Sequence, residues 1–448
     1  MSVYYEDEKA MVYHGDCIEV MRSMPDGSVD AVVTDPPYGI RFMGQAWDGA
    51  DIVARQERGK ATSPMPAGVS GPNGGYRSLA AEAGRYDQSA NATRLFQEWC
   101  EEWAAECLRV LKPGGHLLAF GSPRAWHRLA CGVEDAGFEI RDSIAWLYAS
   151  GFPKSLSVAK AIESREKTGK SNSRSLREVE LAGNGDEYMM TGKNNGIMGE
   201  TVVRTRKQFV PSSEAAQRWE GWGTALKPGF EPCLVARKPL AGTVAENVLA
   251  YGTGALNIDA NRIHSAGSEG RTGGNWRPEN RDTRDEGRTK DGRFPTNVIL
   301  DEQAAAQLDA EAPHTVSTVR KPRAGRSGNG WGMTSTGSEY DDRGGPSRFF
   351  PTFRFEAKAP TSERPNVSGV QHPTVKPLAL MQWLIRLVAP HGATILDPFA
   401  GSGTTLEAGI REGVRVIGIE RESDYLPLIM QRLSKDIDLP LDLEGGVA

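Results

Sequence analysis

Short apolar runs that each end at an acidic residue recur near both ends of this chain. Residues 30–34, DAVVT, predict a buried strand that delivers Asp35 at its carboxyl end. Residues 393–396, ATIL, predict a second strand of the same kind, which delivers Asp397. Helix-length amphipathic stretches lie between such runs, and this alternation is typical of an α/β sheet with mostly parallel strands. Such sheets bind their ligands at the carboxyl ends of the strands.

The periodicity predicts further strands of the sheet and the helices that cover it. Strands are expected at residues 11–14, 116–120, 139–148, 231–237 and 414–419, and helices at 18–24, 92–111, 123–136 and 378–388. Lys112 to Gly115, K-P-G-G, are expected to end the second of these helices before the next strand begins. Trp99 and Trp103 fall on the apolar face of that helix and are expected in the core.

Asp35-Pro36-Pro37-Tyr38 combines groups that can hold a planar amine. The two prolines lack N–H groups and disfavour a helix before them, so the strand stops there on a rigid backbone. The Asp35 carboxylate and the Pro36 carbonyl can accept the two hydrogens of an amino group, and Tyr38 offers an aromatic face for stacking. The simpler interpretation is an ordinary strand-to-loop turn.

The stretch from Asp397 to Thr405, D-P-F-A-G-S-G-T-T, is the second candidate site. Its small side chains let a ligand approach the backbone closely. Glu420, about twenty residues further on, is placed to accept hydrogen bonds from ribose hydroxyls. Neither the G-x-G-x-x-G pattern of nicotinamide sites nor the P-loop pattern occurs in this stretch. An adenosine-containing cofactor of another kind is therefore expected.

Together these motifs resemble the amino-group DNA methyltransferases that use S-adenosylmethionine, in the arrangement called beta. In that family D-P-P-Y comes first, target recognition lies in the middle and the D-P-F-x-G-S-G-T-T loop comes last, which is the order here. Flanking pieces match as well, because Gly15-Asp16-Cys17 precedes the first motif and H-P-T-V-K-P at 372–377 precedes the second. The resemblance covers residues 11–48, 91–150, 228–240 and 349–430.

The resemblance implies a fold, a cofactor and a set of site residues. The fold is a Rossmann-like methyltransferase sheet, mostly parallel with an antiparallel strand near one edge, circularly permuted, with a central loop-rich recognition region. The implied catalytic residues are Asp35, Pro36, Pro37 and Tyr38. S-adenosylmethionine is the implied cofactor, held by Asp16, Cys17, Asp35, Thr374, Lys376, Pro377, Asp397, Pro398, Phe399, Ala400, Gly401, Ser402, Gly403, Thr404, Thr405, Glu420 and Arg421. No metal is implied, and for Asp16 a helix N-cap is an alternative or additional role.

The implied reaction is site-specific methylation of double-stranded DNA at the exocyclic N6 of a flipped-out adenine. Adenine is the first choice because Asp at the first position of the tetrapeptide is commoner in the adenine enzymes of the family, and Ser in the cytosine enzymes. Methylation of cytosine at N4 is the alternative, and a catalytically silent DNA-binding protein is a further one. RNA and protein-glutamine methyltransferases share the tetrapeptide but usually place the cofactor loop first.

The middle of the chain is expected to contact DNA. Phe152 and Lys154 match the family's variable loop, where they would stack on the displaced base and reach a phosphate, with a surface turn as the alternative. Arg204, Arg206 and Lys207 are further candidates for phosphate contacts, with solvated surface as the alternative. Residues 151–370 carry 32 Lys and Arg against 27 Asp and Glu, whereas the remainder carries 21 against 31. This basic middle offsets the unfavourable net charge of −5.

The expected organisation follows the order of the motifs. Residues 1–150 are expected to form the N-terminal half of the core, and the loop at 41–90 is expected to act as a lid over DNA. An insertion is expected at 151–227 and the last core strand at 228–240. The target recognition region is expected at 241–348, the cofactor-binding half of the core at 349–437 and a tail at 438–448.

Composition bounds the location and the partners. The five cysteines form no C-x-x-C pair, so neither a disulfide framework nor a zinc site is predicted. No apolar run is long enough to span a membrane and no signal-peptide pattern is present, so a cytoplasmic protein is expected. The resemblance implies double-stranded DNA as a partner. Family members also suggest two further partners, a cognate restriction endonuclease and a second copy of the chain in a homodimer.

Overall fold

The computed structural model describes residues 2–38, 90–149, 151, 155–169, 185–194, 197–207, 209–263, 292–317, 342–353, 364–367 and 369–435. The chain divides into two compact units, and each is treated by itself below. The larger unit comprises Met1–Ser150 with Phe230–Ala448, and the smaller comprises Gly151–Gly229. The candidate residues Phe152 and Lys154 lie outside the described residues, as do residues 41–89 of the loop predicted at 41–90 and the tail predicted at 438–448.

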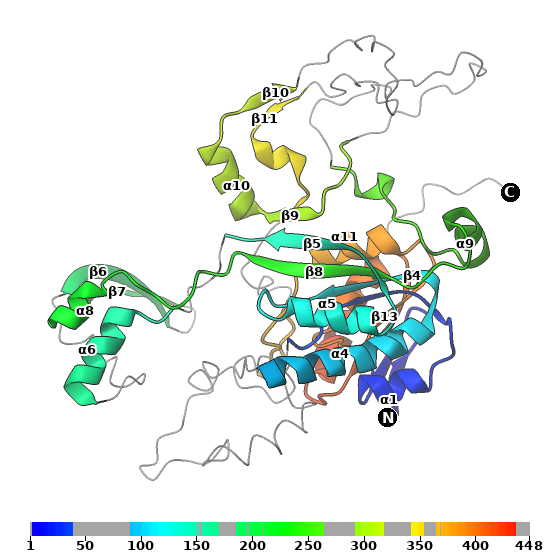
Figure 1. Cartoon of the computed structure of the whole chain (residues 1–448), viewed down its shortest axis with the longest axis horizontal. Coiled ribbons are helices and arrows are strands. Elements are labelled where there is room, and N and C mark those ends of the chain that lie inside the picture. The colour runs from blue at the N-terminus through cyan, green and yellow to red at the C-terminus, as the bar shows by residue number, and fades with distance from the viewer. Residues whose placement is uncertain are drawn as a thin grey trace. The chain divides into compact units, whose positions relative to one another are not determined.

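A ten-stranded sheet is the centre of the larger unit, in the order β1-β2-β14-β13-β3-β4-β8-β5-β9-β12 (Figure 1). The strands are β1 Ser2–Glu6, β2 Ala10–His14, β3 Val29–Thr34, β4 Leu111–Phe120, β5 Glu139–Leu147, β8 Phe230–Arg237, β9 Val298–Asp301, β12 Thr352–Phe353, β13 Thr394–Asp397 and β14 Arg415–Glu420. All neighbours pair in parallel except β1, which is antiparallel to β2, and β8, which is antiparallel to β4 and β5. The predicted mostly parallel, permuted α/β sheet is confirmed.

The two ends of the chain meet in the middle of this sheet. β13 pairs with β3 on one side and with β14 on the other, and β14 in turn pairs with β2. From β3 the chain proceeds to β4 in one direction, whereas from β13 it proceeds to β14 in the opposite direction. A sheet whose order reverses in this way binds ligands beside the point of reversal, outside the carboxyl ends of the strands. That point lies between Thr34 and Asp397.

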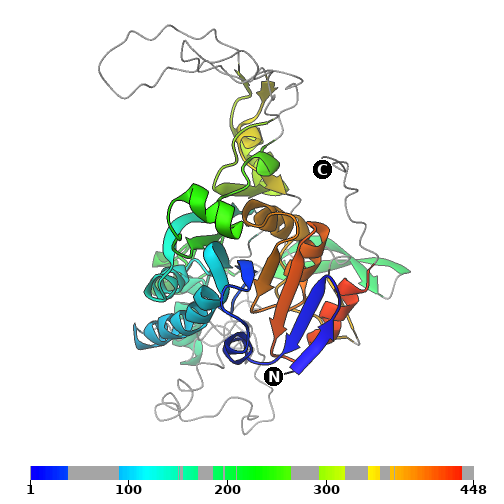
Figure 2. The ribbon, with the colours of Figure 1, turned by 90° about the vertical axis from the view of Figure 1, so that its right-hand side faces the viewer.

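Helices cover both faces of the sheet (Figure 2). α1 Cys17–Arg22, α4 Ala90–Val110 and α5 Trp126–Asp135 supply the core of one face, and α11 Leu378–Val388, α12 Thr404–Arg411 and α13 Leu426–Leu433 supply that of the other. Successive strand residues alternate between the faces, so Val32 packs under the first set while Ala31 and Val33 pack under the second. Trp103 is fully buried as predicted, and Trp99 is packed against the same core.

Further elements border the large sheet. These are α9 Val244–Tyr251, α10 Glu302–Glu311, the short pair β10 Thr315–Ser317 and β11 Asp342–Gly344, and the 3-10 helices η2 Asp259–Asn261 and η3 Pro346–Phe349. α9 contacts β4, and β9 pairs with β5 in the sheet itself. The range 241–348 therefore contributes to the sheet, which the sequence did not predict.

The K-P-G-G stretch departs from the prediction. Residues 112–115 do not separate α4 from the next strand, because β4 already begins at Leu111. The register shifts there, since Leu111 pairs with Val29 and His116 pairs with Ala31. This irregularity is held by Lys112, whose Nζ donates to Oδ1 of Asp30 at 2.5 Å. A side chain at Gly115 would collide with the carbonyl oxygen of Asp30, so the glycine is required by close packing.

The smaller unit contains α6 Val158–Thr168, the antiparallel hairpin of β6 Gly185–Asn194 and β7 Ile197–Lys207, and α8 Glu214–Arg218. Glu163 on α6 is buried and accepts hydrogen bonds from the backbone N–H groups of Ser212 and Ser213. It also pairs with Lys167 one turn later, at 2.6 Å. A single buried carboxylate thus ties α6 to the segment that leads into α8.

The described residues contain neither a membrane-spanning helix nor a cluster of metal ligands. Within the described part of the chain, no helix has the length and apolar character needed to cross a bilayer. The same residues contain no cluster of three or more His, Cys, Asp or Glu side chains arranged to hold a metal ion.

Candidate active site

The D-P-P-Y motif leaves the carboxyl end of β3 at the point of reversal. Pro36 is buried, while Asp35 and Tyr38 are partly exposed. The Tyr38 hydroxyl donates to Oδ1 of Asp35 at 2.9 Å. Burial raises the pKa of Tyr38 well above its ordinary value, and the carboxylates of Asp35 and Glu231 raise it further. The tyrosine therefore stays protonated and acts as a donor toward Asp35.

Lys376 reaches the same carboxylate from the other end of the chain. Its Nζ donates to Oδ2 of Asp35 at 2.5 Å and lies 3.1 Å from the Tyr38 hydroxyl. It also lies 3.3 Å from Oε2 of Glu231 and 4.7 Å from the centre of the Phe120 ring. Burial lowers the pKa of Lys376, but Asp35 and Glu231 raise it by more, so the ammonium form is favoured.

A buried hydrogen bond joins the two motifs. The hydroxyl of Thr34, the last residue of β3, donates to Oδ1 of Asp397, the last residue of β13, at 2.6 Å. The Phe399 N–H donates to the same carboxylate oxygen at 3.1 Å. Burial raises the pKa of Asp397 to about 6, against the effect of these hydrogen bonds. The first residue of the D-P-F loop is thus positioned directly by the strand that carries Asp35.

The D-P-F-A-G-S-G-T-T loop turns from β13 into α12. Gly403 has φ +79°, where a side chain is strained, and a Cβ there would also lie 3.2 Å from the Cα of Ile429. The ring of Phe399 packs edge-on against Trp103, with centroids 5.5 Å apart, and tilted against Trp99 at 5.6 Å. The two tryptophans predicted as core residues therefore also hold the loop in place, through their contacts with Phe399.

Glu420 braces the same loop from the end of β14. Its Oε2 accepts the Gly401 N–H at 2.7 Å, and its Oε1 accepts the Glu422 N–H at 2.7 Å. Its side chain is buried, and burial raises its pKa to about 7, with Glu422 and Asp397 adding to the rise. Among the described residues neither Glu420 nor Asp397 has a Lys or Arg partner within ion-pair distance. The glycine-rich loop thus lies beside two buried carboxylates, those of Asp397 and Glu420, without a Lys or Arg counter-charge among the described residues.

A family model of DNA methylases, N6_N4_Mtase, matches residues 29–431, which include both motifs and both ends of the site. The chain belongs to this family. It is a DNA methylase by descent as well as by the arrangement of its motifs.

Individual relatives of this DNA methylase are type II methyltransferases. M.HindIII of Haemophilus influenzae is 23% identical over 430 residues, which cover 94% of each chain. M2.DpnII of Streptococcus pneumoniae is 44% identical over 66 residues, 15% of this chain and 25% of that one. Among solved structures, the cytosine-N4-specific PvuII DNA methyltransferase is 12% identical, covering 97% of this chain and 89% of that one, with a TM-score of 0.40. The M1.HpyAVI complex with SAM is 15% identical, covering 95% and 100%, with a TM-score of 0.37.

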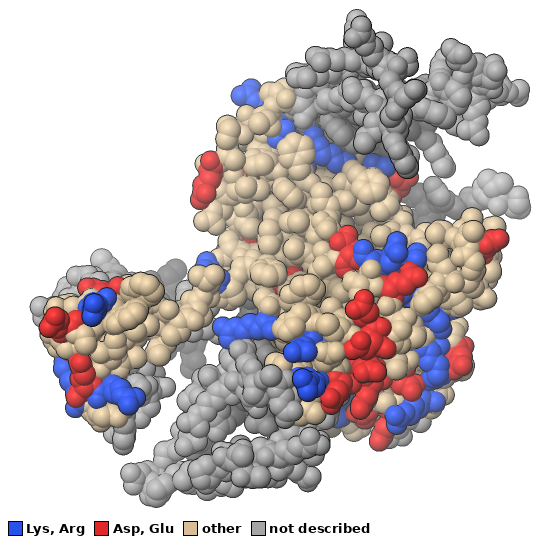
Figure 3. Space-filling view, in the orientation of Figure 1, with Lys and Arg blue, Asp and Glu red and all other residues tan. Residues whose placement is uncertain are grey.

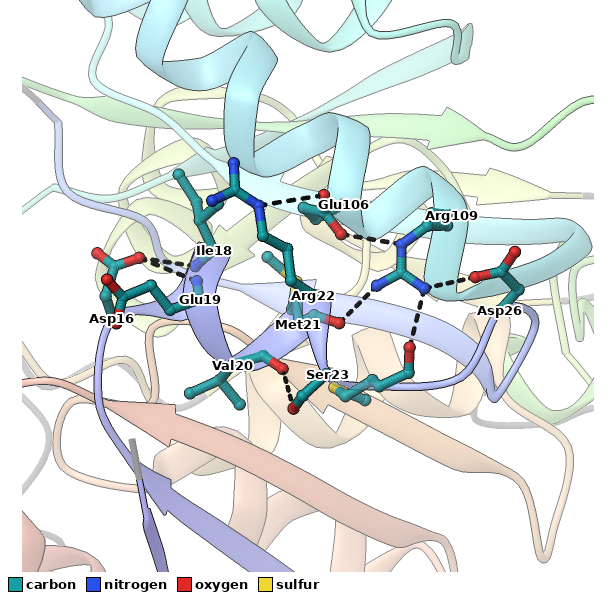
Figure 4. Close-up of polar contacts among 11 residues, drawn as sticks. Asp16, Ile18, Glu19, Val20, Met21, Arg22, Ser23, Asp26, Glu106 and Arg109 are labelled. Carbon is teal, nitrogen blue, oxygen red and sulfur yellow. Dashed lines mark hydrogen bonds and ion pairs between the residues drawn. The ribbon is translucent and has the colours of Figure 1, made fainter.

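Asp16 of the DNA methylase is the N-cap of α1 (Figure 4). Its Oδ1 accepts the N–H groups of Ile18 and Glu19 at 3.0 and 3.2 Å. Cys17 follows inside the first turn and is buried. Further along, Arg109 of α4 donates to the carbonyls of Met21 and Met24, which fixes the other end of α1. The N-cap interpretation of Asp16 is therefore correct, and its Oδ2 is not engaged in these capping bonds.

The H-P-T-V-K-P segment lies against the D-P-F loop of the DNA methylase. His372 is bonded through Nδ1 to the Thr374 carbonyl at 2.5 Å, and its ring stacks edge-on against Tyr425 at 4.6 Å. Burial lowers the pKa of His372 to about 4, so the ring is neutral. A Cβ placed on Gly401 would lie 3.1 Å from its Nε2, which shows how closely ring and loop approach. Pro377 then caps α11, and Arg421 pairs with Glu422 at 3.1 Å.

The remaining predicted DNA contacts lie on the smaller unit. Arg204, Arg206 and Lys207 belong to β7, where they pair in register with Tyr188, Asp186 and Gly185 of β6. Their side chains, like Phe152 and Lys154, are outside the description.

Acidic side chains gather over α4 and α5 on the face that Figure 3 shows. α4 contributes Glu98, Glu101, Glu102 and Glu106. Such a surface repels the phosphate backbone of nucleic acid. The D-P-P-Y motif lies elsewhere, directly after the carboxyl end of β3.

The sequence did not single out Thr34, Phe120 or Glu231, although all three contact the site. Thr34 precedes the motif directly and could have been found as the one polar side chain ending an apolar run. Glu231 is the second residue of β8, which runs antiparallel to its neighbours, so the first residues of β8 lie at the carboxyl ends of the other strands. An acidic residue at the start of an otherwise buried strand, Glu231 in F-E-P-C-L-V-A-R, was the available signal.

Proposed function

We propose that this DNA methylase transfers the methyl group of S-adenosylmethionine to the exocyclic N6 of an adenine flipped out of double-stranded DNA. The observation that carries the proposal is the hydrogen bond from Thr34 to Asp397. It brings the end of the strand that carries Asp35 to the start of the glycine-rich loop, so an acceptor site and a donor site share one edge of the sheet.

The donor end suits a cationic ligand. Asp397 and Glu420 are buried carboxylates whose pKa values are raised to about 6 and about 7, and a nearby positive charge would stabilise their ionised forms. S-adenosylmethionine, when bound, supplies an electrophilic methyl group on a positively charged sulfur. In this proposal Glu420 accepts hydrogen bonds from the ribose hydroxyls, and Gly401 and Gly403 leave room for the ligand beside the backbone.

The acceptor end orients the amine. Asp35 and the Pro36 carbonyl accept the two N–H hydrogens of the target amine, which turns the nitrogen lone pair away from the ring and toward the methyl group. Bound S-adenosylmethionine would supply the methyl group as an electrophile with a neutral thioether as leaving group, and Asp35 is placed to take up the proton that the methylated amine releases. Positioning of this kind contributes up to about 7 to 11 kcal/mol in the best intramolecular reactions. The flipped base, whose extraction costs a few kcal/mol, is stacked on Tyr38.

Adenine is proposed as the target because the first residue of the tetrapeptide is Asp35, and Asp at this position is commoner in the adenine enzymes of the family. The N4 amine of cytosine would present the same two hydrogens to Asp35 and Pro36, so the experiment has to identify the base. Expression in a host without DNA methylation, followed by modification-sensitive sequencing of the genome, reports base, position and recognition site together. N6-methyladenine at one repeated site is expected. N4-methylcytosine would correct the base, and unmodified DNA would refute the activity.

The proposal extends to the rest of the chain and to its partners. Residues 241–348 are proposed to recognise the target, and Phe152, Lys154, Arg204, Arg206 and Lys207 to contact DNA. A restriction endonuclease of the same site and a homodimer are proposed as partners, the first because the relatives are named as type II enzymes. Light scattering of the purified protein with and without a duplex that carries the site tests the dimer.

A further inference from the structure

Glu231 has no place in the motifs, yet it lies at the centre of the acceptor end. β8 runs antiparallel to β4 and β5, so its beginning lies at the edge where the parallel strands end. Beyond Glu231 the strand is buried throughout, and the Glu231 side chain itself is 24% exposed. Its Oε2 lies 3.3 Å from the Tyr38 hydroxyl oxygen and pairs with Nζ of Lys376, also at 3.3 Å.

Lys376 therefore lies between two carboxylates. Its Nζ is 2.5 Å from Asp35 and 3.3 Å from Glu231, and its side chain is only 9% exposed. The ring of Phe120 closes one side of the ammonium, with its centre 4.7 Å away. A buried ammonium without a partner is strongly unfavourable, so it remains where at least one carboxylate can hold it.

The arrangement creates a conflict with the proposed reaction. Oδ1 of Asp35 accepts from Tyr38 and Oδ2 accepts from Lys376, so the ammonium holds the oxygen that a target amine would use. A charged donor binds a carboxylate more strongly than a neutral amine does. The amine can take its place at Asp35 only if the ammonium has another anion within reach, and Glu231 is that anion.

Resting on the proposed function, we propose that Glu231 is a positioning residue that takes over the Lys376 ammonium when a target amine binds Asp35. The ammonium moves from the closer carboxylate to the farther one, and its charge stays paired throughout. In the absence of DNA, Lys376 holds Asp35 ready as an acceptor and mimics the hydrogen bond of the substrate. Glu231 does not touch the substrate, and it acts only through Lys376.

A double-mutant cycle tests this role because Glu231 should matter only when Lys376 is present. Glu231→Gln keeps the shape and an acceptor for Tyr38 but removes the counter-charge, and Lys376→Met removes the ammonium while keeping an unbranched side chain. We expect Glu231→Gln to lower the single-turnover rate of methyl transfer at least tenfold in the otherwise unchanged enzyme, and less than twofold in the Lys376→Met background. An equal reduction in both backgrounds would overturn the proposal.

A matched control distinguishes the effect of losing the Glu231–Lys376 ion pair from the effect of removing any paired carboxylate of the sheet. Glu139 lies on β5, beside β8, and pairs with Arg237 of β8 at 2.6 Å, away from the D-P-P-Y motif. Glu139→Gln should leave the rate within twofold of the unchanged enzyme. Thermal unfolding of each variant shows whether it is folded, and a Glu231→Gln variant that is unfolded at the assay temperature would mark the residue as structural and overturn the positioning role.

Binding provides a measurement that does not depend on turnover. The affinity is measured with S-adenosylhomocysteine present, on a duplex that carries the target site identified by genome sequencing. Glu231→Gln should weaken this affinity at least fivefold in the otherwise unchanged enzyme and should have no effect in the Lys376→Met background. Equal weakening in both backgrounds would refute the role even if Lys376→Met is inactive. If the unchanged enzyme transfers no methyl group to DNA, the proposed function fails, whereas an active enzyme with additive variants sinks only the role of Glu231.

Discussion

Replacing Glu420 with glutamine is the most informative perturbation of the donor end. The carboxylate is 8% exposed and its pKa is raised from 4.5 to about 7, mainly by burial. An acid whose pKa is higher in the folded state binds its proton more tightly there. Its contribution to stability is therefore fully present below pH 4.5 and is lost as the pH rises through about 7.

The size of this loss follows from the two pKa values. The interval from 4.5 to about 7 corresponds to roughly 3 kcal/mol of unfolding free energy. Glutamine does not titrate, so Glu420→Gln should remove this part of the decline. The amide cannot accept from both the Gly401 and Glu422 N–H groups, because its nitrogen faces one of them, and that costs about 1 to 3 kcal/mol at every pH.

The assay is urea unfolding of the ligand-free protein at several pH values between 4.5 and 8. The unchanged protein should lose roughly 3 kcal/mol more over this range than Glu420→Gln does, while the variant starts from a lower plateau. Asp397, whose pKa is raised to about 6, titrates within the same range, and because its charge raises the pKa of Glu420, the difference between the two curves includes this coupling. Parallel curves for the two proteins would refute the claim that Glu420 is held in a charge-poor environment.

Three further predictions concern the two motifs. Asp35→Ala should abolish methyl transfer yet leave the cofactor affinity, measured by calorimetry, within a few fold, and retained turnover would contradict the acceptor role. Thr34→Val should lower the unfolding free energy by about 1 to 3 kcal/mol, because Asp397 loses a buried donor at nearly constant volume; an unchanged urea midpoint would show that the bond contributes nothing. Gly403→Ala should destabilise the protein by about 1 to 3 kcal/mol, since φ is +79° and Ile429 is 3.2 Å from the new carbon, and a wild-type melting temperature would disprove that constraint.

Local patterns sufficed for the elements that carry the motifs. α11 spans Leu378–Val388 as predicted, and β3 differs from its prediction by one residue, because a mostly apolar run with a proline close to its end leaves little choice of boundary. β1 was missed, since its residues are mostly exposed and the three residues that follow it, Asp7, Glu8 and Lys9, are charged. Its place in the sheet depends on pairing with β2 rather than on its own composition.

Contacts between distant segments had no local signal. Lys376 and Asp35 are 341 positions apart, and the sequence could assign each to the site by motif but could not indicate that they pair. Glu231 has no motif at all, so only the antiparallel direction of β8 brings it to Tyr38. The K-P-G-G stretch was misplaced for the same reason, because Asp30 accepts from Lys112 across the sheet and keeps those residues in β4.

The placement of β13 between β3 and β14 has a consequence for synthesis. The ribosome completes β3 by residue 34 and reaches β13 only at residue 394, which at 5 to 20 residues per second takes roughly 20 to 70 s. During that interval β3 has one unpaired edge, which is prone to aggregation unless it is shielded. A chain that ends before β14 therefore lacks the strand that joins β13 to β2, and it is expected to be inactive.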